Sequence, residues 1–132
     1  MGHRFGTFVL VAATLFCLLT TWSSGVAPAR FADRLGLTIA NTSGTNEIRA
    51  QYTGFFFAVA AVCLAALAGA LSRQAAFVLL AAVFGGLIVG RGVSLLINGG
   101  MRDYSPTIVA LYAIDSVGLA LALAGYAFDR PV

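Results

Sequence analysis

Residues 75–97 read AAFVLLAAVFGGLIVGRGVSLLI, an apolar run whose only charge is Arg91. About 20 mainly apolar residues are enough for a helix to cross the hydrocarbon core of a bilayer. In lipid, a helix satisfies its own backbone hydrogen bonds, whereas an open strand leaves them unpaired. This stretch therefore predicts a membrane-spanning helix.

Three further runs have the same character on either side of it. Ser72-Arg73-Gln74 is a short link to the preceding run, which predicts an antiparallel hairpin. Asn98-Gly99-Gly100 is a typical helix end, and Ser105-Pro106 is a typical helix start. The sequence thus predicts one membrane domain over residues 1–132, an all-α antiparallel bundle of four transmembrane helices. The predicted spans are residues 5–22, 50–71, 75–97 and 107–128.

The composition agrees with a membrane protein. Of the 132 residues, 60% are hydrophobic and 10% are charged, against roughly 25% charged in soluble domains. The mean hydropathy is +0.93. The eight basic residues are all arginines, and they are scattered along the chain. Because nucleic-acid binding needs a clustered basic face, we expect the lipid bilayer, and no nucleic acid, as a partner.

The longest predicted loop, residues 23–49, contains a short amphipathic pattern. Phe31, Leu35 and Ile39 recur every four residues after Pro28. The pattern predicts a short helix that either lies on the membrane surface or caps the end of the bundle. An even number of spans puts both termini on one side. Arg4 precedes the first span, which favours the cytoplasmic side of a bacterial inner membrane.

Two charges lie inside predicted spans, Arg91 and Asp115. An isolated charge there costs several kcal/mol, and both residues lie near the same membrane face. We therefore predict that they pair. Other polar residues gather at that end, so the predicted intramembrane cluster comprises Glu47, Arg49, Tyr52, Arg91, Tyr112 and Asp115. Either the cluster is structural, or it has a function. It would then bind an anionic or polar head group, which guanidinium suits, or carry protons through Asp115, whose protonation can change in a low-dielectric site.

Small residues recur at helical spacing in three spans. Such faces let helices approach closely in lipid, so we expect them to pack within the bundle or against a partner subunit. The predicted packing residues are Gly54, Ala58, Ala61, Ala65, Gly69, Gly86, Gly90, Gly118 and Ala122.

Catalytic patterns are missing from the sequence. The single histidine, His3, lies near the N-terminus, and no cysteine–histidine spacing suits zinc or haem. There is no nucleophile elbow, P-loop or dinucleotide motif. We expect no catalytic residue, no metal and no cofactor.

Two stretches resemble a bacterial family of small membrane proteins catalogued as domain of unknown function 4345. They are NEIRAQYTGF at residues 46–55, with Asn46 and Arg49 three apart, and LIVGRGVS at residues 87–94, with Gly90-Arg91. Thr53 stands where a glycine is common in the family, and Asn98 where an aspartate is common. The resemblance covers nearly the whole chain. It implies the four-span fold and no reaction.

The leading functional expectation is a non-enzymatic accessory or scaffold subunit of a larger membrane complex. Small-residue faces and the absence of a soluble domain favour it. The alternative is a small transporter or a lipid- or small-molecule-binding protein that uses the cluster around Arg49, Arg91 and Asp115.

Overall fold

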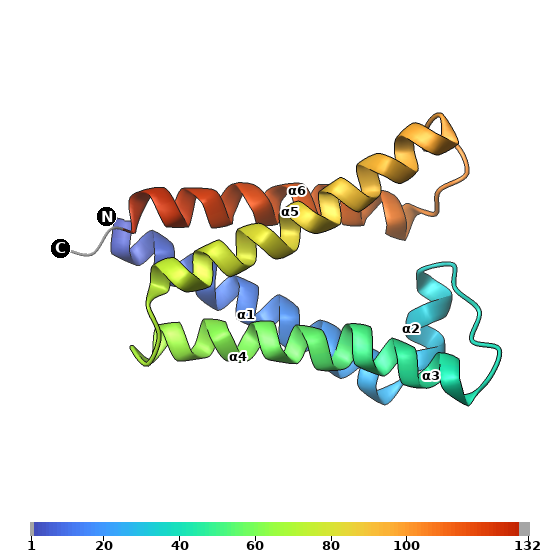
Figure 1. Cartoon of the computed structure of the whole chain (residues 1–132), viewed down its shortest axis with the longest axis horizontal. Coiled ribbons are helices and arrows are strands. Elements are labelled where there is room, and N and C mark those ends of the chain that lie inside the picture. Colours follow the sequence, from blue (N-terminus) through green and yellow to red (C-terminus); the bar gives the residue numbers. More distant parts are fainter. Residues whose placement is uncertain (1, 130–132) are drawn as a thin grey trace.

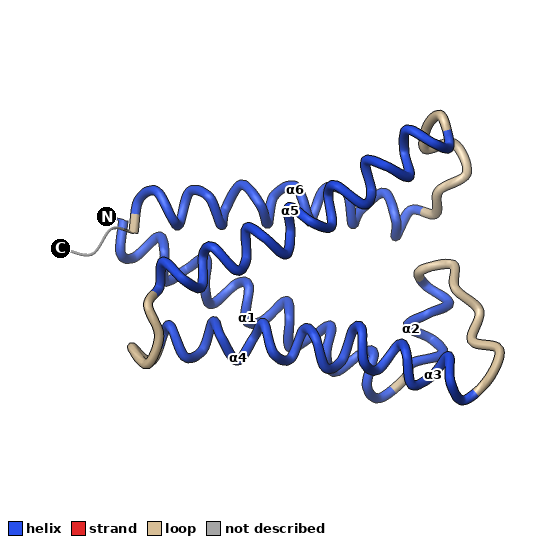
Figure 2. The backbone as a smooth tube through the Cα atoms, viewed as in Figure 1, coloured by secondary structure: helices blue, strands red, loops and turns tan. Residues whose placement is uncertain are grey.

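The computed structural model describes residues 2–129, and these form helices without strands (Figures 1 and 2). Four helical stretches are long and apolar enough to cross a membrane, which makes the chain a multi-pass membrane protein. The elements are α1 (Gly2–Val26), α2 (Pro28–Arg34), α3 (Thr42–Ile48), the π-helix η1 (Arg49–Gly54), α4 (Phe55–Leu67), α5 (Arg73–Asn98) and α6 (Pro106–Phe128).

The four spans form two helix pairs. Helix α1 packs along α4 and η1, and α5 packs along α6. Figure 1 shows the pairs meeting near the chain termini and diverging toward the end that carries α2 and α3. Large side chains fill the region where the pairs meet, with Leu10, Phe77 and Leu80 fully buried.

Both ends of α5 and the start of α6 have capping residues, and those at Gly99 and Ser105 confirm the sequence prediction. Ser72 accepts a hydrogen bond from the Ala75 amide and begins α5, and Ser105 caps α6 in the same way. Gly99 ends α5 at a φ of 65°, a left-handed conformation that glycine adopts without strain.

The second span differs from its predicted limits of 50 and 71. It runs over Thr42–Leu67 as α3, η1 and α4 in succession. Asn41 caps its start by accepting from the Gly44 amide, and Gly69 stops it at a φ of 77°. The polar residues of α3 carry no hydropathy signal, which is why the prediction began eight residues late.

Helix α2 is the predicted amphipathic helix, and it caps the diverging end of the bundle. Ala32 is fully buried, and the Phe31 ring lies 4.9 Å from the Tyr52 ring. Gly36, at a φ of 75°, follows the end of the helix. Ile39 therefore lies outside it, and the predicted hydrophobic stripe is shorter than expected.

Only some of the predicted packing residues lie inside the bundle. Ala122 is buried, and Gly118 lies against Phe84. The stripe on α4 turns away from the bundle, because bulkier side chains such as Phe56 and Val59 fill the interface with α1. Ala65 is half-buried. The other predicted packing residues are exposed within residues 2–129 and so do not pack inside the bundle: Gly54, Ala58, Ala61, Gly69, Gly86 and Gly90.

Glycines on α6 and α5 give a matched test of this packing. A Cβ on Gly125 would lie 2.5 Å from the buried Phe77 ring, whereas a Cβ on Gly86 would meet nothing within 4 Å. Overpacking costs about 1–3 kcal/mol, and replacing a helical glycine with alanine returns about 1 kcal/mol. Gly125→Ala should therefore lower the free energy of unfolding in detergent by up to about 2 kcal/mol. Gly86→Ala should leave it unchanged or raise it, and equal effects would contradict the packing.

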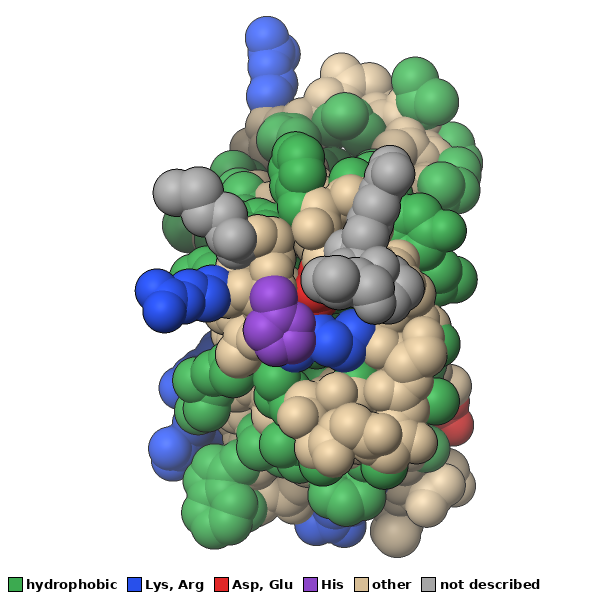
Figure 3. Space-filling view, turned by 90° about the vertical axis from the view of Figure 1, so that its left-hand side faces the viewer, with side chains coloured by type: hydrophobic (Ala, Val, Ile, Leu, Met, Phe, Trp, Pro, Cys, Tyr) green, Lys and Arg blue, Asp and Glu red, His purple; other side chains and the backbone are tan. Residues whose placement is uncertain are grey.

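An ionic cluster ties the chain ends to the α4–α5 turn. Arg73 Nε donates to Asp129 Oδ2 at 2.5 Å, and Gln74 donates to the Asp129 carbonyl. His3 Nδ1 lies 3.5 Å from the same carboxylate. Figure 3 looks onto this end, where histidine, arginine and acidic side chains lie together. These contacts help hold the helix pairs together at the end where they converge.

Candidate functional site

The predicted Arg91–Asp115 pair is present. Arg91 Nε on α5 donates to Asp115 Oδ2 on α6 at 2.5 Å. The Asp115 side chain is 3% exposed and the Arg91 side chain 21% exposed. Within residues 2–129, only Nε of the Arg91 guanidinium has a hydrogen-bond partner. Its terminal nitrogens are thus free to bind a further anion, since a guanidinium offers five donors.

A polar network surrounds this pair toward the α5–α6 loop. The Tyr112 hydroxyl donates to the Arg91 carbonyl at 2.8 Å, and its ring lies 5.4 Å from the guanidinium carbon. Ser94 Oγ lies 2.9 Å from the Tyr104 hydroxyl, to which Asn98 Nδ2 donates at 3.1 Å. Hydrogen bonds with Ser94 and Asn98 lower the pKa of Tyr104 below its ordinary value. Of this network, Tyr112 is the residue that contacts Arg91, and it joins α6 to α5 beside the ion pair.

A cavity of about 760 Å³ opens where the helix pairs diverge, and the ion pair forms part of its wall. Aromatic and aliphatic side chains make up most of the rest. Its lining is Phe16, Thr20, Ser23, Phe31, Arg34, Leu35, Leu37, Gln51, Tyr52, Phe55, Phe56, Leu87, Arg91, Thr107, Ile108, Leu111 and Asp115. The site thus combines an apolar chamber with a charged wall.

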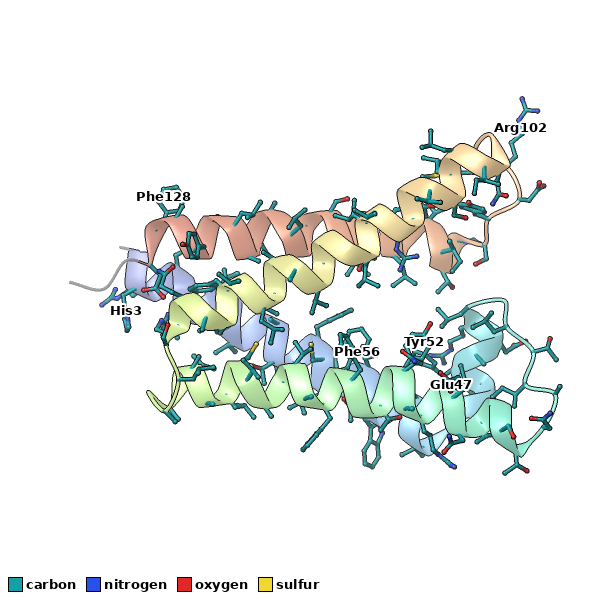
Figure 4. All side chains as sticks on the ribbon, in the orientation of Figure 1. His3, Glu47, Tyr52, Phe56, Arg102 and Phe128 are labelled. Atoms are coloured by element: carbon teal, nitrogen blue, oxygen red, sulfur yellow. The ribbon has the colours of Figure 1, made fainter. Side chains whose placement is uncertain are left out.

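The predicted cluster does not come together as one site. Tyr52 lines the cavity with Arg91 and Asp115, and Tyr112 contacts Arg91 from α6. Glu47 and Arg49 lie apart from them. Glu47 accepts from Gln51 on its own helical stretch, and Arg49 Nε reaches the Gly25 carbonyl at 3.5 Å. Figure 4 shows the labelled Tyr52 and Phe56 on the side of their helix that faces the other pair.

The π-helix η1 contains both Arg49, which lies apart from the cavity, and Tyr52, which lines it. Its wider turn shifts the register of the side chains between exposed Arg49 and cavity-lining Tyr52. Thr53, which replaces the glycine common in the resembling family, shares a 2.9 Å hydrogen bond with Ser24. This bond joins η1 to α1. No sequence pattern predicts a π-helix.

Several cavity residues were not predicted from the sequence. Arg34 and Phe31 come from α2, and Phe16 comes from the middle of α1. The amphipathic pattern of α2 gave a usable signal, because a helix that caps the bundle must turn some side chains inward. Phe16 looked like any apolar residue of a span.

Comparison with known proteins gives a match to a family model. No curated protein and no solved structure matches the chain. A family model described as Domain of unknown function (DUF4345) matches residues 5–126. The first motif, residues 46–55, runs from the end of α3 through η1 to the first residue of α4, and the second, residues 87–94, lies in α5 around Arg91. The chain is therefore a member of the family known as Domain of unknown function (DUF4345).

Proposed function

We propose that this protein binds a membrane-resident amphiphile with an anionic head group in the cavity between its two helix pairs. The observation that carries the proposal is the cavity of about 760 Å³ with the Arg91–Asp115 pair in its wall. Small-molecule sites are typically about 300–1,000 Å³, mainly apolar, with a few placed polar groups. Ionisable residues inside a membrane commonly mark binding sites or pathways.

The charge of the lining favours an anion. Arg34 and Arg91 contribute two positive charges and Asp115 one negative charge, which leaves 2 − 1 = +1. The terminal nitrogens of Arg91 suit a carboxylate or a phosphate. The aromatic walls around Phe16 and Phe56 suit an alkyl chain. An amphiphile would satisfy both parts of the cavity at once.

Thermal unfolding in maltoside micelles tests this proposal. Dodecanoate should raise the melting temperature of the unmodified protein more than dodecanol does, because a ligand that binds only the folded state stabilises it by mass action. Arg34→Gln should weaken dodecanoate binding about threefold to fivefold, the value of a partly wet charge contact. Arg49→Gln removes an exposed arginine outside the cavity and should change nothing. Equal shifts with dodecanoate and dodecanol, or equal effects of the two variants, would contradict the proposal.

A second candidate is the accessory subunit expected from the sequence. The exposed small residues of α4, including Ala58 and Ala61, favour it, because such a face accepts a neighbouring helix closely. Purification in mild detergent distinguishes the two candidates. A stoichiometric co-purifying protein that is lost on Ala61→Leu would support the subunit, and a lone monomer would argue against it.

We place the protein in a bacterial inner membrane with both termini in the cytoplasm. Four spans put residues 2 and 129 on one side, and Arg4 precedes the first span, which favours the cytoplasmic face. A fluorescent protein fused at the C-terminus should fluoresce in bacteria, whereas an alkaline phosphatase fusion should be inactive. The opposite pattern would invert the topology.

A further inference from the structure

A second cavity, of about 330 Å³, lies between α1, α5 and α6 on the side where the helix pairs converge. Its wall is apolar throughout, and it includes Val9, Ala13, Leu80, Phe84 and Leu121. Phe16 lines this cavity and also the larger one that contains Arg91. One aromatic side chain therefore stands between two chambers.

The two cavities follow the same helix faces. On α1, Val9, Ala13, Phe16 and Thr20 succeed one another every three or four residues, which places them on one face of a helix.

Helix α5 repeats the arrangement. Leu80 and Phe84 line the smaller cavity, and Leu87 and Arg91 continue into the larger one. The chambers are successive parts of one groove, apolar at the converging end and charged at Arg91.

Phe16 is held across this groove by neighbouring rings. Its centroid lies 6.2 Å from that of Phe56 on α4 and 6.3 Å from that of Phe84 on α5. Beyond it, the seven residues from Phe16 back to Val9 lengthen the groove by about 10 Å. A chain that stops at Phe16 fills only the larger chamber, whereas a longer chain has to displace the ring.

Resting on the proposed function, we infer that the occupant is a single-chain anionic amphiphile, with its head group at Arg91 and its tail pointing toward Val9. Phe16 sets the chain length that the groove admits. The cavity beyond Phe16 has less than half the volume of the larger one, about 330 Å³ against about 760 Å³, which favours one alkyl chain over two. Phe16 thus acts as a specificity residue, and Arg91 binds the head group.

A chain-length competition tests this inference. The purified protein in maltoside micelles is mixed with equal mole fractions of straight-chain carboxylates from octanoate to octadecanoate, and native mass spectrometry reports which of them stay bound. Phe16→Ala should move the preferred carboxylate to longer chains. The enrichment should be about eightfold for four added carbons, from the binding gained per atom of a drug-sized ligand.

Two further variants make the test independent of general changes to the protein. Phe8 lies on the same helix as Phe16, and it is 62% exposed. Phe8→Ala should therefore leave the preference for carboxylate length unchanged. Ala113 is exposed at the rim of the smaller cavity, so Ala113→Phe should obstruct that cavity and shift the preference of Phe16→Ala back to shorter chains.

The outcomes separate the inference from the proposed function. If neither a carboxylate nor an alkyl phosphate of any length is retained by the unmodified protein, the proposed function fails. If carboxylates are retained but Phe16→Ala and Phe8→Ala show the same length profile as the unmodified protein, only the role of Phe16 is overturned. A parallel series of alkyl phosphates shows whether the protein prefers a carboxylate or a phosphate head group. Displacement of the carboxylates by phosphatidylglycerol would overturn a single-chain occupant.

Discussion

Arg91→Leu and Asp115→Leu should each lower the free energy of unfolding by about 3–5 kcal/mol, and the double substitution should cost less than either one. Each single substitution strands a charge inside the membrane, because the Arg91–Asp115 contact of 2.5 Å is the only ion pair of either residue within residues 2–129. The double substitution leaves no charge to strand. Arg91 is partly exposed and can turn toward the nearer membrane face, so Arg91 alone should tolerate loss of its partner better than Asp115 does.

The measurement is a double-mutant cycle of thermal or denaturant unfolding in detergent, with Glu47→Gln as the control. Glu47 is exposed, and within residues 2–129 its side chain bonds to Gln51 alone, so its substitution should have little effect alone and should add to either mutation. Strictly additive losses for Arg91→Leu and Asp115→Leu would show that the two residues do not stabilise one another.

Phe77→Ala should be the most damaging apolar substitution. Phe77 is fully buried where the helix pairs converge, in contact with Gly125. Phe→Ala costs about 3–5 kcal/mol in soluble cores. Part of that cost is hydrophobic transfer, which contributes little between helices in lipid, so we expect about 2–3 kcal/mol from lost packing.

The neighbouring Val78 is the matched control, because it lies on the same helix and is exposed to lipid. Val78→Ala should change the free energy of unfolding by less than about 0.5 kcal/mol. Comparable losses for the two substitutions, measured by the same unfolding experiment, would mean that α5 does not present Phe77 to the core.

Strong local signals in the sequence predicted most of the fold. Length and hydropathy located the four spans, the short link at Ser72 predicted the hairpin, and Gly99 and Ser105 located the end of α5 and the start of α6. The Arg91–Asp115 pair could also be predicted, because the cost of a buried charge leaves few alternatives to pairing. Each of these predictions depends on a local pattern or on a large energetic penalty.

The remaining features depend on how the helices rotate and diverge. Nothing in the hydropathy of α4 distinguishes the stripe of Ala58 and Ala61 from the face of Val59 and Cys63, since both are apolar, and only the second is buried. Arg49 was assigned to the cluster by its position along the chain. It lies apart because its helix turns it toward Gly25.

The Arg73–Asp129 pair was also not predicted, because both residues lie outside the predicted spans. The predicted topology already places Arg73 and Asp129 at the same end of the bundle. That shared position was the signal from which their pairing could have been predicted.

Photocrosslinking tests most directly whether the cavity between the helix pairs holds an anionic amphiphile. A dodecanoate carrying a diazirine at the end of its chain would be bound, irradiated and located by peptide mass spectrometry. The proposal predicts adducts on Phe16, Phe56 and Leu87, which line the cavity, and their suppression by unlabelled dodecanoate but not by dodecanol. Adducts confined to lipid-facing side chains such as Phe57 and Leu123, unaffected by either competitor, would contradict it.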